Sequence, residues 1–287
     1  MIQRSIPQKV KRQHMHSRVF NRLRYYNLIM GSFHFIQGIF VLLLSNDFSL
    51  PVTASFMDGP PVSGGGFQEI DTLFSINIGW AVATFVFLSA IAHFSVSLPG
   101  VFGWYTRNLQ RNRNYARWIE YSISASIMIA LIALLPGITD VVALLGILAM
   151  NAAMILFGLL MEHYEEPGNP NWTTFLFGTL IGLVPWIGIV IYLWSPLTES
   201  SPPGFVYGIF FSMFVFFNSF AINMILQYKQ IGPWRNYLFG ESMYIFLSLA
   251  AKSALVWQVF AGTLLSLIHI SEPTRRYAIS YAVFCLK

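Results

Sequence analysis

The stretch YIFLSLAAKSALVWQVFAGTL, residues 244–264, is an apolar run with a single charged residue, Lys252, near its middle. A helix of about 20 residues is long enough to cross the roughly 30 Å hydrocarbon core of a bilayer. Lys252 stands eleven residues after Glu241, where the run begins, so its ammonium lies too deep to reach water easily. This stretch predicts a membrane-spanning helix with a buried lysine.

The whole chain has the composition of a membrane protein. Of its 287 residues, 55% are hydrophobic and 10% are charged, whereas a soluble domain carries about 25% charged residues. Lipid offers backbone groups no hydrogen-bond partner, so each long apolar run is predicted to be a helix. We expect an all-α, rhodopsin-like bundle of seven transmembrane helices. The predicted spans are 24–46, 72–97, 115–137, 139–162, 173–195, 203–228 and 236–263.

Two connections between the predicted spans have informative lengths. The turn around Pro136, Gly137 and Asp140 is so short that the third and fourth spans must be antiparallel neighbours. The connection 47–71 is long, and it has two alternating stretches on either side of a Pro- and Gly-rich centre. This pattern predicts a small β-hairpin in the first extracellular loop, with a flexible loop as the alternative.

Lys and Arg are unevenly distributed among the connections. The N-terminal segment, the second connection and the sixth carry seven, four and two of them, whereas the other connections between spans carry none. Cytoplasmic loops are enriched in these residues, so we predict a multi-pass cell-membrane protein with a cytoplasmic N-terminus and an extracellular C-terminus. The short basic runs lack interleaved aromatic residues, which argues against a nucleic-acid partner.

The chain divides into three parts. Residues 1–23 form a basic cytoplasmic segment, and residues 24–264 form the membrane domain. The tail 265–287 does not fit what precedes it and resembles translated adaptor sequence, so we expect it to be non-native. The only cysteine, Cys285, lies in this tail, and neither a metal site nor a disulfide is expected.

Two residues of opposite charge are expected at comparable depth. Glu120 in the third span is the only intramembrane carboxylate available to Lys252. A buried lysine either pairs with a carboxylate or loses its proton and forms a Schiff base with a carbonyl. Spacing alone leaves a structural ion pair as the alternative. Ser248, one turn before Lys252, and Ser124, one turn after Glu120, lie on the same faces and favour a ligand site.

Large flat or pliant side chains surround the predicted pair. They suit an elongated slot for a polyene, although such residues are more often plain helix packing. Asn151 is included with them, with interhelical hydrogen bonding as its alternative role. The slot residues that we expect beside the ligand are Met128, Asn151, Met154, Trp186, Phe217 and Trp257.

Two intramembrane histidines, His34 and His93, are predicted in the cytoplasmic half of the bundle, together with Ser89 and Gln37. A lone histidine in a helix is usually a packing residue. Here, however, the titratable groups gather on one side of Lys252, and the outer halves of the spans offer no acid or histidine. A proton pump needs stations on both sides, so we predict a one-sided cluster that accepts and returns a proton.

Seven spans with a lysine in the last and a carboxylate in the third are typical of opsins. The local sequences indicate one particular family. The chain closely resembles heliorhodopsins over about residues 24–264, and the predicted inverted orientation agrees with that family. The stretches that carry the resemblance are GSFHFIQ (31–37), DGPP (58–61), RWIEYSISASIMI (117–129), NAAMILFG (151–158), VPWIG (184–188), PPGFVYGIFFSMFVFFNSFA (202–221) and residues 244–264.

The resemblance implies an all-trans retinal bound covalently to Lys252 as a Schiff base, with Glu120 as its counterion. It also implies photoisomerisation to 13-cis, a slow photocycle, a homodimer in the lipid bilayer and generally no ion pumping. The residues it places around this centre are Ser248, Tyr121 and Ser124 beside the counterion, and His34 and His93 in the proton-accepting cluster.

The predicted function is therefore a non-pumping retinal photoreceptor that signals to an unknown cytoplasmic partner. A light-driven or light-gated ion transporter on the same scaffold is the first alternative. The second is a retinal-free membrane scaffold or transporter in which Lys252 and Glu120 form a structural pair. An enzyme is not expected, because no nucleophile–base set or metal-ligand spacing is visible.

Overall fold

The structure is a computed structural model that describes residues 8–57, 68–194 and 201–284, with side chains for 18–57, 70–194 and 201–262. Seven helices in this part of the chain are long and apolar enough to cross a membrane, which confirms the predicted all-α bundle. They are α1 (Gln8–Leu44), α2 (Ile78–Ser97), α4 (Tyr115–Leu134), α5 (Val141–Tyr164), α6 (Thr173–Leu193), α7 (Gly204–Tyr228) and α8 (Tyr237–Phe284); the spanning parts of α1 and α8 are Arg18–Leu44 and Tyr237–Gly262.

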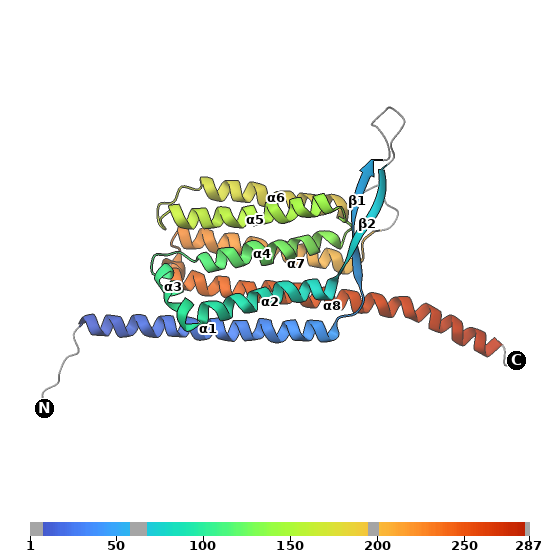
Figure 1. Cartoon of the computed structure of the whole chain (residues 1–287), viewed down its shortest axis with the longest axis horizontal. Helices are drawn as coiled ribbons and strands as arrows, with labels where there is room; N and C mark the ends of the chain where they lie inside the picture. Colours follow the sequence, from blue (N-terminus) through green and yellow to red (C-terminus); the bar gives the residue numbers. More distant parts are fainter. Residues whose placement is uncertain (1–7, 58–67, 195–200, 285–287) are drawn as a thin grey trace.

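The seven helices lie side by side in a bundle (Figure 1). In the order of their contacts the helices form a ring: α1 packs on α2, α2 on α4, α4 on α5 and α5 on α6. α7 packs on α8, and α8 also contacts α1. Trp186 of α6 contacts Phe210 and Phe217 of α7, which joins the two halves of the ring. One end of the bundle carries the short helices α3 (Pro99–Leu109) and η1 (Gly232–Arg235), and we call it the α3 end. The opposite, hairpin end carries the two strands.

The predicted hairpin is confirmed. β1 (Ser49–Met57) and β2 (Gln68–Asn77) pair antiparallel, with a register shift between Val52 and Thr53. Val52 is buried, and Thr53 N donates to Thr139 O at 2.9 Å in the turn between α4 and α5. These contacts fix the base of the hairpin on the bundle. The DGPP stretch, 58–61, lies outside the described residues.

Some predicted boundaries were wrong. Residues 72–77 were assigned to the second span, but they belong to β2, because this segment pairs with β1. The α2 helix begins only at Ile78, where the Asn77 side chain accepts a hydrogen bond from Trp80 N at 3.0 Å. α3 was not predicted at all; its first residue is Pro99, a residue type that favours the first turn of a helix.

Two helices extend beyond the predicted spans. α1 begins at Gln8, inside the predicted N-terminal segment 1–23, whose residues 1–7 lie outside the described residues. α8 continues to Phe284, through most of the predicted tail 265–287, and Cys285 lies outside the described residues.

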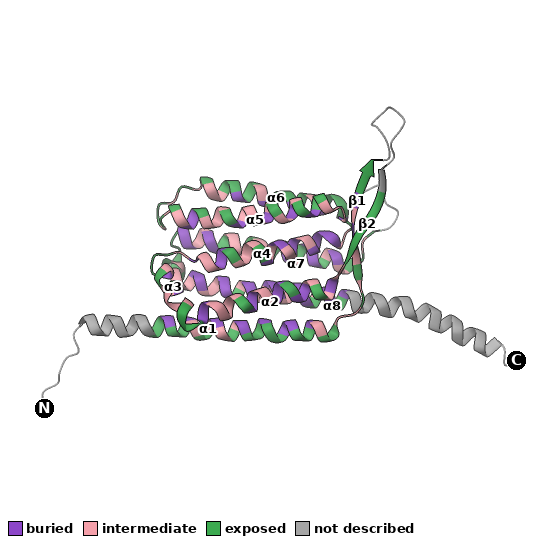
Figure 2. Cartoon of the chain, viewed as in Figure 1, coloured by how far each residue is buried: buried purple, intermediate pink, exposed green. Residues whose placement is uncertain are grey.

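Burial separates an apolar half of the bundle from a polar half. Beyond Glu120 and Lys252, toward the hairpin end, the interior is a continuous apolar cluster that includes Ile132 of α4 and Leu255 of α8. Buried polar side chains gather instead toward the α3 end. Figure 2 shows that the outward faces of the helices carry many exposed residues, and large apolar side chains are frequent among them, as the hydrocarbon of a bilayer requires.

Candidate functional site

Lys252 of α8 and Glu120 of α4 form an ion pair inside the bundle. Lys252 Nζ lies 2.9 Å from Glu120 Oε1 and donates to Ser248 Oγ at 3.1 Å. Ser89 of α2 donates its hydroxyl to the same carboxylate oxygen at 2.6 Å. The Lys252 and Glu120 side chains are only 4% and 10% exposed, so each charge depends on the other and on these hydroxyls for compensation.

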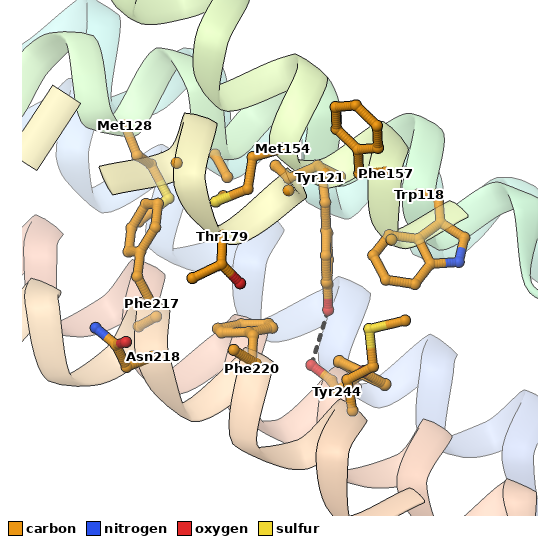
Figure 3. Close-up of a pocket in the computed structure, with 18 of the residues that line it drawn as sticks. Trp118, Tyr121, Met128, Met154, Phe157, Thr179, Phe217, Asn218, Phe220 and Tyr244 are labelled. Carbon is orange, nitrogen blue, oxygen red and sulfur yellow. Dashed lines mark hydrogen bonds between the residues drawn. The ribbon is translucent and has the colours of Figure 1, made fainter. Parts of the chain in front are cut away.

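An apolar pocket opens beside this pair between α4, α5, α6, α7 and α8, and we call it the lysine pocket (Figure 3). Lys252 and Ser248 form part of its wall. Figure 3 shows Met128 and Phe217 toward one end of the pocket and Trp118 toward the other. Other wall residues are Tyr121, Met154, Phe157, Trp186 and Phe220. The pocket is therefore long, largely apolar and flanked by aromatic rings.

Two glycines allow large side chains to lie at the edge of the lysine pocket. A Cβ at Gly158 of α5 would come within 2.5 Å of the Trp118 ring. At Gly182 of α6, a Cβ would clash with the sulfur of Met154. A long apolar space with one amine in its wall suits a long apolar molecule that carries a carbonyl group.

The two predicted histidines lie together next to the ion pair. His34 of α1 is fully buried, and its ring stacks on that of His93 of α2, with 5.6 Å between the ring centroids. His93 Nδ1 lies 2.8 Å from Asn27 Oδ1. Neither ring nitrogen of His34 has a hydrogen-bond partner among the described residues. Gln37, one turn along α1, accepts a hydrogen bond from Ser253 of α8 at 3.2 Å.

Two predicted slot residues, Asn151 and Trp257, are not among the described residues that line the lysine pocket. Asn151 donates to Ser126 of α4 at 3.0 Å, the interhelical hydrogen bond that was its alternative role. Trp257 is 49% exposed on the outside of α8. It follows Lys252 by five residues, which turns it about 140° away around the helix. Ser124 is fully buried on α4, one turn after Glu120.

A second buried charge cluster, at the α3 end, was missed by the sequence interpretation. Arg117 of α4 pairs with Glu241 of α8 and, at 2.7 Å, with Glu162 of α5. Its guanidinium also lies 3.9 Å from the ring centroid of Tyr244 and 4.4 Å from that of Trp118. No buried role was predicted from the sequence for Arg117, Glu162 or Glu241. The available signal was that Arg117 precedes Glu120 by three residues, on the same helix face.

Replacing Arg117 with alanine is expected to destabilise the protein by about 3–5 kcal/mol, because Glu162 and Glu241 would remain buried without a cation. Thermal unfolding of the purified protein in detergent measures the effect. Arg107→Ala is the matched control, because Arg107 is an exposed arginine at the same end and its loss should change stability by less than about 1 kcal/mol. Equal melting of Arg117→Ala and the unmodified protein would contradict the assigned role of the cluster.

Comparison with known proteins decides which family combines these features. The model of the heliorhodopsin family matches residues 23–264. The chain belongs to the heliorhodopsin family. This match confirms the resemblance inferred from the sequence, and it includes both members of the Lys252–Glu120 pair. Residues 265–287 of this heliorhodopsin lie outside the matched range.

The fold of this heliorhodopsin is also similar to a solved structure. The transmembrane domain and linker region of the rhodopsin phosphodiesterase from Salpingoeca rosetta superposes with a TM-score of 0.65 over 96% of this chain and 82% of that one. The two sequences are 12% identical, so the likeness shows a shared rhodopsin fold and no more. No curated protein sequence matches this chain significantly.

Proposed function

We propose that this heliorhodopsin is a light-sensing membrane photoreceptor that carries all-trans retinal on Lys252 as a Schiff base. One observation carries the proposal: Lys252 Nζ stands in the wall of an apolar pocket, 2.9 Å from the Glu120 carboxylate. Membership of the heliorhodopsin family supports retinal as the chromophore.

The residues of the lysine pocket fit retinal. An amine is needed to hold the aldehyde, and Lys252 supplies it at the wall. Flat and pliant side chains are needed along the polyene, and Trp118, Met128, Trp186 and Phe217 supply them. When bound, retinal supplies the absorption of visible light and a light-driven change of shape.

The chain's own groups then hold charge and proton at the Lys252 nitrogen. Glu120 balances a positive charge there, and the Ser89 hydroxyl fixes the carboxylate oxygen that faces the nitrogen. Ser248 gives the same nitrogen a second polar partner. We assign His34 and His93 as the groups that accept a proton from this centre, because the His34 ring nitrogens have no other partner among the described residues.

Proton export is not part of the proposal. In the spans that the structure describes, the halves that face the hairpin end contain no Asp or Glu, and their one histidine, His34, stacks on His93 of the α3-side half of α2. A proton that leaves Lys252 therefore has acceptors toward the α3 end and returns by the same side. We propose that the α3 end is cytoplasmic, because the loop cations lie there. The proposal includes a homodimer and a cytoplasmic partner that reads the slow photocycle.

Expression with all-trans retinal should give a coloured protein that carries no steady current in the light. The test combines a visible spectrum of the purified protein with voltage clamp of illuminated cells. A colourless protein would support the retinal-free scaffold. A coloured protein with a steady photocurrent would replace the non-pumping photoreceptor with a transporter.

A further inference from the structure

A second pocket lies at the α3 end, apart from the lysine pocket, and we call it the amide pocket. Its volume is about 650 Å³, within the range of about 300–1,000 Å³ that is usual for ligand sites. The elements around it are α1, the end of α3, the end of α7, η1 and the start of α8. Five of its lining residues carry side-chain amides: Gln110, Asn112, Gln227, Gln230 and Asn236.

Three of the five amides offer hydrogen-bonding groups that the fold uses little or not at all, whereas Gln227 donates to Tyr237 O and Asn236 Oδ1 accepts from Leu238 N. The side chains of Gln110 and Asn112 are exposed and have no hydrogen-bond partner among the described residues. Gln230 makes only one long contact, from Nε2 to Pro167 O at 3.3 Å. A carboxamide presents a donor beside an acceptor, the same pair that a peptide unit presents. A wall of several carboxamides therefore matches an extended peptide backbone.

Exposed cations lie in the segments that line the amide pocket. Arg235 lines the pocket, and Arg111 and Lys229 are the chain neighbours of lining residues on two other segments. All three cations are exposed. The lining contains no carboxylate, and Glu166, next to the lining Pro167, is the exposed acid nearest to it in sequence. This charge distribution complements an acidic ligand.

Two segments of the pocket wall begin at helix C-terminal caps. Among the described residues, two non-glycine residues have a positive φ, Asn112 at 55° and Gln230 at 52°, and both line the amide pocket. Gly232, between two lining segments, has φ 55°. Asn112 and Gln230 both follow the end of a helix, α3 and α7, where Arg113 N donates to Asn108 O at 3.0 Å and Ile231 N donates to Leu226 O at 3.1 Å. This is the usual C-terminal cap of a helix, and it fixes the course of the two segments that line the pocket.

Hydrogen bonds connect the amide pocket to the lysine pocket. Tyr237 lines the amide pocket and donates its hydroxyl to Glu162 Oε1 at 2.8 Å. Glu162 Oε2 accepts a hydrogen bond from Trp118 Nε1 at 2.5 Å, and Trp118 lines the lysine pocket. Gln227, another lining residue, donates to Tyr237 O at 3.2 Å. A displacement of Trp118 thus reaches the wall of the amide pocket through two side chains.

We propose that the amide pocket binds an acidic peptide segment of a cytoplasmic protein, and that its affinity changes with the state of the lysine pocket. The dependence of this affinity on the state of the lysine pocket rests on the proposed photoreceptor function. A nucleotide fits less well, because Arg235 is the one cation among the described lining residues, whereas five carboxamides are available to a peptide backbone. Since coupling between two sites is reciprocal, bound peptide also changes the lifetime of the light state.

The test uses the retinal-loaded full chain in nanodiscs whose lipids carry no net charge. Fluorescein-labelled hexaglutamate is the probe, and its binding is measured by fluorescence anisotropy. Binding in the dark is expected, and Arg235→Gln should weaken it about tenfold. Arg107→Gln removes an exposed arginine at the same end that does not line the pocket, and it should change affinity less than twofold. Absence of binding, or equal losses in the two variants, would overturn the site.

Two further arms separate the components of the proposal. Inorganic phosphate at matched ionic strength should not displace hexaglutamate; full displacement would make the pocket a simple anion site and overturn the peptide assignment. Illumination should change the affinity of the loaded protein and leave that of Lys252→Arg unchanged. If the protein is coloured but its affinity for hexaglutamate is the same in the dark and in the light, the proposed coupling is wrong. Dark binding and its loss in Arg235→Gln test the pocket even if the protein proves colourless, in which case only the photoreceptor assignment fails.

Discussion

Lys252→Arg is expected to abolish the visible absorption band of the protein expressed with all-trans retinal. Arginine keeps a positive charge beside Glu120, so the buried carboxylate retains a partner and the bundle should still fold. A guanidinium, however, does not act as the amine nucleophile that a Schiff base requires. The loss of colour therefore reports the covalent link and not the loss of the ion pair. The measurement is a visible spectrum of equal amounts of purified protein.

Lys229→Arg is the matched control for this loss of colour. Lys229 is exposed at the end of α7, so the same substitution there should leave the band unchanged. Size-exclusion profiles and circular dichroism establish that both variants are folded. A folded Lys252→Arg protein with the visible band of the unmodified protein would rule out Lys252 as the attachment site.

Glu120→Gln is expected to displace the absorption maximum strongly and to make the band depend on pH. The substitution removes the carboxylate that lies 2.9 Å from Lys252 Nζ and leaves a buried positive charge without its partner. Breaking a buried pair in this way costs about 3–5 kcal/mol. The equilibrium for holding a proton on that nitrogen then falls about a hundredfold or more. Spectra recorded from acid to alkaline pH measure both effects.

Glu120→Asp is the companion variant, because it keeps the negative charge and shortens the side chain by one carbon. It should retain a visible band near the original pH range, with a smaller displacement than Glu120→Gln. If Glu120→Gln had the same spectrum and pH dependence as the unmodified protein, the counterion would have to be another group.

Much of the fold was predictable because the membrane imposes strong constraints on sequence. Long apolar runs place the spans within a few residues, as for α6, predicted at 173–195 and found at Thr173–Leu193. The errors occur where water meets the bundle. Residues 72–77 are apolar enough to extend the second span, and only their pairing with β1 makes them a strand. That pairing depends on a partner segment, which apolar content along one segment does not reveal.

Within the site, the sequence identified the groups whose burial is costly. Lys252 and Glu120 stood out because charged residues are rare at membrane depth, and the structure brings them together. Trp257 was misplaced because it was chosen by residue type, whereas its position is set by helix rotation. The Arg117 cluster was missed because its members stand at predicted span ends, where charges usually meet water. Packing of α4, α5 and α8 buries them instead.

The α3 end therefore contains buried charged and hydrogen-bonded groups that its loop-like sequence does not indicate. Glu162 receives hydrogen bonds from Trp118 on one side and from Tyr237 on the other. A change in the lysine pocket and a ligand at this end would act on the same carboxylate. Under the two proposals above, isomerisation of retinal on Lys252 would act on the end of the bundle where the acidic peptide is proposed to bind.

Chemical mapping locates the residue to which retinal is attached. The protein is expressed with all-trans retinal, reduced with borohydride to fix any Schiff base, and digested for peptide mass spectrometry. We expect a retinyl adduct on Lys252 and on no other lysine. An adduct on another lysine, or a coloured protein that yields none on Lys252, would contradict this assignment.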